Sequence, residues 1–299
     1  MNTRSADIRT NTLLLRATLF FVTSFVAVSF ASSQVAVKPA VGIIYEAEKD
    51  SVLYAGGCRL IEESVGRSFS PRTINEEMFE QKLKLFRNAK VKVYSCNIFM
   101  HGYLKLVGPS LNEHVVLGYV DTVMQRCSIA GIKLVVLGSG ESRRVPAGFD
   151  HQKAKAQFID ISRKMAMVSA KYGVTIAIEN LNSGETNFIN TLAEALDVVK
   201  QVDHPNFKLT ADIYHMLREN EPASAIEEAG AYLIHCHIAE KEKRTAPGIK
   251  GDDFRPYLGA LKKINFSGVL MLECGWDNIN TQVAPALQYL QRQLDEVYR

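Results

Sequence analysis

The chain has 299 residues, of which 47% are hydrophobic and 22% are charged, with a formal net charge of +3. This composition is ordinary for a globular protein, and the length is sufficient for one large α/β barrel or for two smaller domains. Because no run of basic residues stands out, the charge does not indicate a nucleic-acid partner.

The first 31 residues differ from the rest of the chain. Three arginines precede residues 17–31, a stretch of fifteen apolar or small residues without charge. Such a stretch is short for a membrane span but fits the core of a signal peptide, and Ser29 and Ala31 supply the small residues expected before a cleavage site. We therefore expect a signal peptide over residues 1–31, an N-terminal extension over 32–39 and an exported protein, periplasmic or secreted. An uncleaved membrane anchor is the alternative.

Cleavage would leave 32 basic and 31 acidic residues and no second long apolar run, so we expect no membrane span in the mature protein.

Strand-like and helix-like segments alternate along the remainder of the chain. The eight predicted strands cover residues 40–46, 58–63, 91–99, 132–140, 174–180, 207–213, 232–240 and 268–275. Helical periodicity follows most clearly at 190–202, where Thr191 and Glu194 have the spacing of a capping box, and at 280–298.

Eight β/α units in one uninterrupted segment predict an α/β fold, a closed parallel (β/α)8 TIM barrel over residues 40–299. A doubly wound open sheet is the alternative, and it would usually place a glycine-rich phosphate-binding turn after its first strand. The segment IIYEAEKDS (residues 43–51) contains no glycine. No linker-like stretch rich in proline, glycine or serine divides residues 40–299, so we expect a single domain.

The last four predicted strands each end on an ionisable side chain. Alternate residues of a barrel strand face the interior, and this phase places four polar groups inside, Glu179, Asp212, His237 and Glu273. Successive members of the set are 33, 25 and 36 residues apart, which is one β/α unit each time. We therefore expect all four at the carboxyl ends of the strands, where barrel enzymes build their active sites.

Three carboxylates in one small space repel one another unless a cation lies among them. A single divalent ion would remove this repulsion, and a set of Asp, Glu and His ligands suits Mn²⁺, Mg²⁺, Co²⁺ or Zn²⁺. We therefore predict that the four residues ligate one divalent metal ion. For each residue alone, a buried polar group satisfied by hydrogen bonds is the alternative.

Five short motifs resemble those of a known family. They are IENLN (178–182), ADIYH (211–215), HCHIAE (235–240), LECGW (272–276) and GSGESRRVPAGFD (138–150). In this order they resemble the xylose isomerase-like TIM-barrel superfamily, in the sugar isomerase/epimerase branch that includes ketose 3-epimerases and hydroxypyruvate isomerase. The resemblance implies that the four residues bind one divalent metal and that Glu179 and Glu273 also act as an acid/base pair. Proton transfer next to a carbonyl needs a base on one face and an acid on the other, and a metal stabilises the enediolate.

Further residues are candidates for substrate binding. The resemblance implies that His215, three residues after Asp212, hydrogen-bonds a substrate oxygen, whereas an exposed loop histidine is the alternative. The family usually places an arginine about six residues after the metal-binding histidine, where this chain has Lys243 followed by Arg244. Either residue could contact the substrate, and both could instead be solvated charges of the loop.

Three other residues are candidates for the substrate site. Glu62, at the end of the second predicted strand, would orient a hydroxyl group or a metal ligand. Arg143, in the loop after the fourth strand, could bind an anionic group, although no clear phosphate-binding helix begins there. Trp276, the only tryptophan, could wall the pocket against the apolar face of a sugar, or it could have an ordinary packing role.

These features predict a metal-dependent isomerase or epimerase of a free sugar, a ketose or a related polyhydroxy carbonyl compound. Two alternatives stay open: a dehydratase of a keto-inositol or keto-sugar, and a secreted sugar-binding barrel without turnover. An endonuclease IV-like repair function is not favoured, because it needs a richer histidine-based site and a basic DNA-binding face, and the chain has seven histidines. Export argues for an unphosphorylated substrate, and a homo-oligomer is compatible with the sequence.

Overall fold

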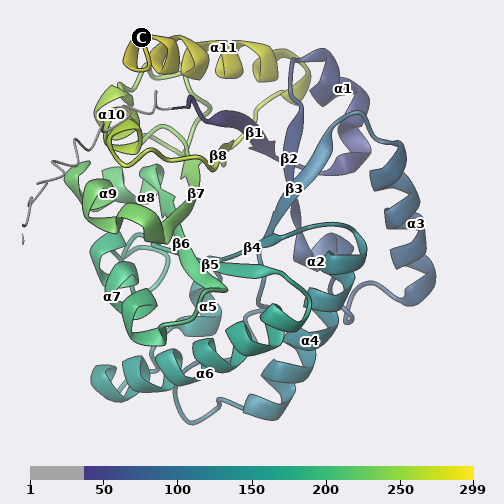
Figure 1. The fold of residues 1–299 in the computed structure, drawn as a ribbon, viewed down its shortest axis with the longest axis vertical. Helices are drawn as coiled ribbons and strands as arrows, with labels where there is room; N and C mark the ends of the chain where they lie inside the picture. Colours follow the sequence, from purple (N-terminus) through teal and green to yellow (C-terminus); the bar gives the residue numbers. More distant parts are fainter. Residues whose placement is uncertain (1–36) are drawn as a thin grey trace, which may run out of the picture. The chain divides into compact units, whose positions relative to one another are not determined.

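Residues 37–299 are described by the structure, a computed structural model, and their backbone closes into a barrel of eight parallel strands (Figure 1). Neighbouring strands follow one another in chain order, and they are β1 (Ala40–Ile44), β2 (Leu60–Ser64), β3 (Lys92–Asn97), β4 (Leu134–Leu137), β5 (Thr175–Glu179), β6 (Phe207–Asp212), β7 (Leu233–Ile238) and β8 (Val269–Leu272). Each strand lies within or overlaps the range predicted from the sequence. The predicted (β/α)8 TIM barrel is therefore confirmed, and the open-sheet alternative is wrong.

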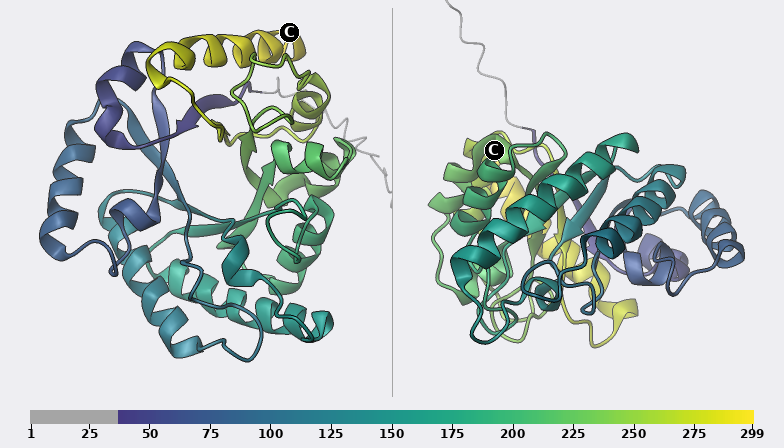
Figure 2. Two further views of the ribbon diagram at one scale, coloured as in Figure 1. Left: turned by 180° about the vertical axis from the view of Figure 1, so that it is seen from behind. Right: turned by 90° about the horizontal axis from the view of Figure 1, so that it is seen from below.

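Helices surround the strands, as the views from behind and from below show (Figure 2). The longer ones are α3 (Glu76–Asn88), α4 (Glu113–Ile129), α6 (His151–Lys171), α7 (Leu192–Val202), α10 (Arg255–Lys263) and α11 (Ile279–Val297). The shorter ones are η1 (Ala47–Lys49), α1 (Asp50–Ala55), α2 (Val65–Ser68), α5 (Gly140–Arg143), α8 (Ile213–Arg218), α9 (Ser224–Ala229) and η2 (Gly230–Tyr232). Helices α2 and α8 begin directly after β2 and β6, so they lie at the carboxyl ends of the strands.

Helix α7 shows how local sequence signals produce the outer layer. The hydroxyl group of Thr191 accepts a hydrogen bond from the backbone N–H of Glu194 at 3.1 Å, and the Glu194 carboxylate accepts one from the N–H of Thr191 at 3.3 Å. This pair completes the predicted capping box. Leu192, Ala195 and Val199 form the buried stripe of the helix, which packs on β5 and β6.

The alternation of side chains along the strands agrees with the predicted phase. On β5, Ile176 and Ile178 belong to the hydrophobic core between the strands and the helices. Ala177 and Glu179, the intervening residues, are also buried, and they point to the other face of the strand. The carboxylate of Glu179, the last residue of β5, therefore lies in the interior of the barrel.

The parallel register gathers the polar strand ends at one level. Asp212 on β6 is paired directly with His237 on β7. The backbone N–H of Glu273, which follows β8, donates to the carbonyl group of Ile238 on β7 at 3.1 Å. Because β5 pairs with β6, Glu179 joins the same end of the barrel. All four predicted ligands are thus at the carboxyl ends of the strands.

The predicted signal peptide, residues 1–31, lies outside the described residues, as does most of the predicted extension. Within residues 37–299, the helices are all too short or too polar to cross a membrane. Export therefore stays a prediction from the sequence.

Candidate metal centre

The carboxyl ends of β5 to β8 bring the four predicted metal ligands together. One ligand atom from each of Glu179, Asp212, His237 and Glu273 lies within 4.8 Å of the other three. The Nδ1 atom of His237 is 2.6 Å from Oε1 of Glu179 and 2.7 Å from Oε2 of Glu273. Glu273 is partly exposed, and the other three residues are buried. The arrangement places two carboxylates against one imidazole nitrogen and a third carboxylate in the same cluster.

Asp212 is held in place by the start of α8 and by the end of β5. Its Oδ1 atom accepts hydrogen bonds from the backbone N–H groups of Tyr214 at 2.7 Å and His215 at 3.3 Å, so it caps the helix. The side-chain amide of Asn180 accepts from the Asp212 N–H at 3.0 Å and donates to the Asp212 carbonyl at 3.3 Å. The second carboxylate oxygen, Oδ2, faces the cluster, where a guanidinium nitrogen of Arg244 lies 3.1 Å away.

Gly138, directly after β4, leaves the space that the Glu179 carboxylate fills. A Cβ atom at this position would lie 2.3 Å from Oε2 of Glu179, which is closer than any non-bonded contact allows. A Cβ atom at this position would therefore displace the Glu179 carboxylate from its place in the cluster.

The donor atoms of the cluster fit a divalent cation. Nδ1 of His237 carries at most one proton, so it can donate a hydrogen bond to only one of the two carboxylates beside it. It is hydrogen-bonded to Glu179, while Oε2 of Glu273 accepts no well-formed hydrogen bond from residues 37–299, although the atom is buried. A cation among these groups would take a lone pair from each side chain. One nitrogen and three or more carboxylate oxygens suit Mn²⁺, Mg²⁺, Co²⁺ or Zn²⁺.

The electrostatics of the cluster favour bound positive charge. Burial raises the pKa of Glu179 to about 8, and the nearby carboxylates of Glu273 and Asp212 add to the increase, against the opposing effect of His237. Burial disfavours a charged imidazole, yet the carboxylates of Glu62, Glu179 and Glu273 raise the pKa of His237 well above its usual value. Burial is thus the main cause for Glu179 and the neighbouring carboxylates are the cause for His237, and a metal cation would offset the negative charge that contributes to both shifts.

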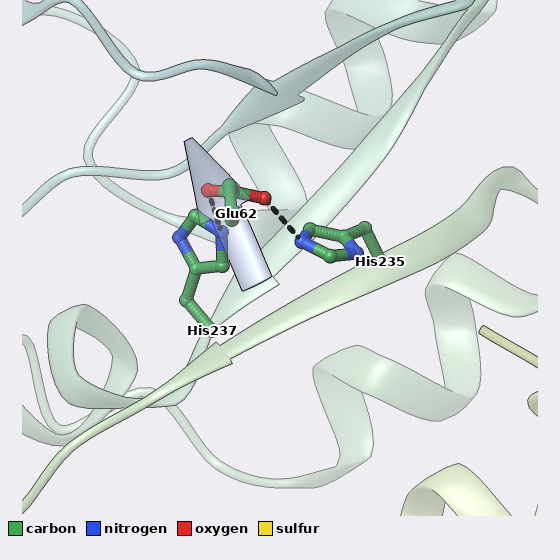
Figure 3. A group of neighbouring side chains, drawn as sticks. All are labelled: Glu62, His235 and His237. Carbon is green, nitrogen blue, oxygen red and sulfur yellow. Dashed lines mark hydrogen bonds and ion pairs between the residues drawn. The ribbon is translucent and has the colours of Figure 1, made fainter. Parts of the chain in front are cut away.

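A further carboxylate lies on the other side of His237. Glu62 on β2 is fully buried beside His235 and His237 of β7 (Figure 3). Its Oε2 atom is 2.8 Å from Nε2 of His235 and accepts a hydrogen bond from the Ser95 hydroxyl at 2.6 Å, and its Oε1 atom lies 3.0 Å from Nε2 of His237. With a metal ion bound at Nδ1, the carboxylate of Glu62 would hold the ring proton on Nε2 and so would leave the lone pair of Nδ1 free for the ion.

The ligand atoms of Glu62, His235 and His237 also lie within 4.8 Å of one another. This second group shares His237 with the first one, and its Glu62 carboxylate faces the ring nitrogen of His237 that points away from Glu179 and Glu273. Of the two roles predicted for Glu62, its position matches that of a residue that orients a metal ligand.

His215 and Arg244, both predicted to bind substrate, lie beside the cluster. His215 is fully buried, so the alternative of an exposed loop histidine is wrong, and its Nε2 atom is 3.3 Å from Oδ2 of Asp212. A guanidinium nitrogen of Arg244 is 2.8 Å from Oε2 of Glu273. Lys243 is exposed on the same loop. The arginine, and not the lysine, therefore faces the cluster.

Neither Arg143 nor Trp276 is joined to the four predicted ligands by a hydrogen bond or an ion pair within the described part of the chain. Arg143, on α5, is fully buried, and its guanidinium nitrogens have no hydrogen-bond partner among residues 37–299. Burial lowers its pKa to about 10, against the opposing effect of Glu179 and Glu185. Trp276 is partly buried and packs against the hydrophobic core, which fits the packing role.

Two residues of the loop after β5 belong to the site and were not predicted, Asn182 and Glu185. The Nδ2 atom of Asn182 is 2.8 Å from Nδ1 of His215 and donates to Oε1 of Glu185 at 3.2 Å. The same carboxylate oxygen is 3.6 Å from a guanidinium nitrogen of Arg244. Asn182 could have been included because it lies in the IENLN motif beside a predicted ligand, whereas the sequence around Glu185 carries no comparable signal.

Fold and site together define the class of this protein, a (β/α)8 barrel with a candidate carboxylate–histidine metal centre at the carboxyl ends of its last four strands. The chain belongs to the xylose isomerase-like TIM barrel family, whose model matches residues 55–293. The family inferred from the motifs is thereby confirmed.

Two of the curated relatives that the chain resembles are sugar 3-epimerases. The chain is 36% identical over 116 residues to D-psicose 3-epimerase of Ruminiclostridium cellulolyticum, which is 38% of this chain and 39% of that protein. It is 34% identical over 120 residues to L-ribulose 3-epimerase of Methylomonas sp., which is 40% of this chain and 42% of the relative. Each alignment therefore spans less than half of the relative.

The fold is also that of a solved D-psicose 3-epimerase with D-tagatose from Clostridium cellulolyticum H10. The TM-score is 0.72 at 19% sequence identity, and the match covers 83% of this chain and 93% of that chain. At this identity the likeness shows the fold alone.

Proposed function

We propose that the protein is a divalent-metal-dependent sugar isomerase or epimerase that acts on a ketose or a related polyhydroxy carbonyl compound through an enediolate. The observation that carries the proposal is the approach of four ligand atoms to within 4.8 Å of one another, from Glu179, Asp212, His237 and Glu273. The names of two similar proteins, D-psicose 3-epimerase and L-ribulose 3-epimerase, support the same type of reaction.

Glu179 and Glu273 are the proposed acid/base pair, because they reach His237 from different strand ends, β5 and β8. One carboxylate takes the proton from the carbon next to the carbonyl group, and the other, which starts protonated, returns a proton to the opposite face. The carbon is inverted, and the two glutamates exchange protonation states. A divalent metal held by the four residues would stabilise the negative charge that develops on the substrate oxygens. His215 and Arg244 would hold those oxygens in position.

Proton exchange in D₂O tests this proposal. The protein is incubated with Mn²⁺ and a panel of ketoses, and NMR follows the incorporation of deuterium next to the carbonyl group. We expect Glu179→Gln and Glu273→Gln each to abolish the exchange. Glu141→Gln is the matched control, because the Glu141 side chain, on the short helix α5, is 61% exposed. Exchange at the wild-type rate in either of the first two variants would exclude that residue from the acid/base role.

The products of the same incubation separate the alternatives. An isomer or epimer has the mass of the substrate, whereas a product lighter by one water would show the dehydratase, in which the enediolate expels a β-hydroxyl group. Calorimetric binding of sugar without any exchange would show a sugar-binding barrel without turnover.

We also propose that the protein is exported, which the uncharged stretch at residues 17–31 supports. Cell fractionation with N-terminal sequencing tests this proposal, and a mature chain that starts after Ala31 is the expected result. A full-length chain in the cytoplasm would contradict it.

A further inference from the structure

The loop between β7 and α10 contains a buried carboxylate that the proposed reaction does not use. Glu240, two residues after β7, is fully buried. A buried carboxylate is costly unless hydrogen bonds or a cation compensate its charge. The atoms around Glu240 show that hydrogen bonds from its own loop supply the compensation.

Five donors of the loop converge on the two oxygens of Glu240. Oε1 accepts from the backbone N–H groups of Gly248 and Gly251, both at 2.8 Å, and of Asp252 at 3.4 Å. Oε2 accepts from the N–H of Lys250 at 2.6 Å and from the hydroxyl group of Thr245 at 2.8 Å. Backbone N–H groups gathered around an anion form a nest, which here is closed by a residue of the same loop. One side chain thus connects the two halves of the loop.

The segment that Glu240 encloses has an unusual backbone. Lys243 and Arg244 both adopt the left-handed conformation, with φ of 58° and 53°. Residues other than glycine rarely do so, and two in succession persist only where the surrounding structure enforces them. The N–H of Glu240 donates to the carbonyl group of Thr245 at 3.0 Å, and the carbonyl group of Arg244 accepts from the N–H of Gly275 at 2.8 Å.

We propose that Glu240 is a positioning residue whose carboxylate holds this loop in the turn that directs Arg244 into the site. The guanidinium group of Arg244 lies 3.1 Å from Oδ2 of Asp212 and 2.8 Å from Oε2 of Glu273. A loop displacement of about 1 Å would break both contacts, because hydrogen bonds weaken steeply beyond their normal length. The inference rests on the proposed function only for the role of Arg244 in substrate binding.

The single tryptophan of the chain directly follows a residue that is bridged to this loop, so its fluorescence serves as the reporter. Trp276 follows Gly275, which forms an isolated parallel bridge with Thr245 and donates to Arg244. The indole ring is partly buried. If the loop loses its turn, the ring becomes more accessible to a soluble quencher.

Glu240→Gln is the decisive variant, because it replaces one acceptor oxygen with an NH₂ donor that faces other donors. We expect acrylamide quenching of Trp276 fluorescence to increase about two-fold, since the loop opens locally. With substrate, KM should rise about ten-fold at nearly constant kcat, which is the signature of lost substrate binding. The Kd for Mn²⁺ should not rise. Glu242→Gln is the matched control, since the side chain of this glutamate is 59% exposed on the same loop and forms an ion pair with Lys250, and the variant should behave as wild type.

Wild-type quenching and KM in a folded Glu240→Gln variant would overturn the proposal. If that variant does not fold, Thr245→Val replaces it in the test, because this substitution removes a single hydrogen-bond donor from the Glu240 carboxylate. Increased quenching of Trp276 in Thr245→Val would support the proposal, and wild-type quenching would overturn it. Quenching is measured without substrate. If none of the ketoses in the panel undergoes proton exchange, the proposed function is refuted. The role of Glu240 in the loop is still decided by the fluorescence measurement.

Discussion

Replacement of Gly138 by alanine is expected to disable the metal site without unfolding the barrel. The added methyl carbon would lie 2.3 Å from Oε2 of Glu179, whereas ordinary contacts begin at 3.4 Å. The carboxylate must therefore retreat by about 1 Å. The retreat costs little, because the carboxylate is the end of a flexible side chain. The backbone of Gly138 is not in the left-handed region, so it accommodates alanine.

The size of the effect follows from the tolerance of metal coordination. Ligand distances vary by about 0.2 Å in working sites, so a displacement of about 1 Å takes Glu179 out of the coordination sphere. Loss of a residue that only orients a metal ligand raises the Kd for the metal about 10- to 100-fold. Because Gly138→Ala displaces a ligand itself, we expect it to raise the Kd at least about 100-fold. A 100-fold increase in Kd corresponds to a loss of about 2.7 kcal/mol of binding free energy. The free energy of unfolding without metal should change by less than about 1 kcal/mol.

Isothermal titration calorimetry with Mn²⁺ and urea unfolding of the metal-free protein measure the two quantities. Gly118→Ala is the matched control, because a Cβ atom at this position of α4 meets nothing within 4 Å. It should bind Mn²⁺ as the wild type does. Wild-type affinity in a folded Gly138→Ala variant would refute the assignment of Glu179 as a ligand.

Three further substitutions test other parts of the structure. Glu62→Gln should raise the Kd for Mn²⁺ about 10- to 100-fold in calorimetry, because it weakens the carboxylate that orients His237, and unchanged affinity would exclude this role. Thr191→Ala should lower the free energy of unfolding in urea by about 1 kcal/mol through loss of the helix cap, and an unchanged value would show that the cap is redundant. Gly42→Ala should lower it by about 1–3 kcal/mol or more, because its Cβ would lie 2.7 Å from the backbone oxygen of Leu60, and a fully stable variant would contradict this packing.

Strand periodicity was sufficient to predict the centre of the site. Side chains alternate between the two faces of a strand, so a carboxylate that continues the inward set of β5 must enter the barrel, and a slip of one residue would turn it outward. The same reasoning applies to Asp212, His237 and Glu273. Because the parallel strands of a barrel all end on the same side, the alternation pattern of each of the last four strands was enough to predict that the four side chains lie close together.

Contacts across the barrel and within loops could not be predicted in this way. Glu62 meets His235 at a separation of 173 residues, and no local period encodes which side chain it faces in the interior. The choice between Lys243 and Arg244 depends on two successive left-handed residues, which the loop imposes through contacts that the sequence pattern does not reveal. Glu185 lies in a loop, where no side-chain periodicity indicates that the residue is close to the site.

Anomalous X-ray scattering from a crystal of the Mn²⁺-bound protein tests the central claim most directly. The structure predicts one manganese peak per chain, with ligand atoms of Glu179, Asp212, His237 and Glu273 at about 2.0–2.3 Å from the ion. A manganese peak elsewhere on the chain, with these four side chains outside coordination distance, would contradict it.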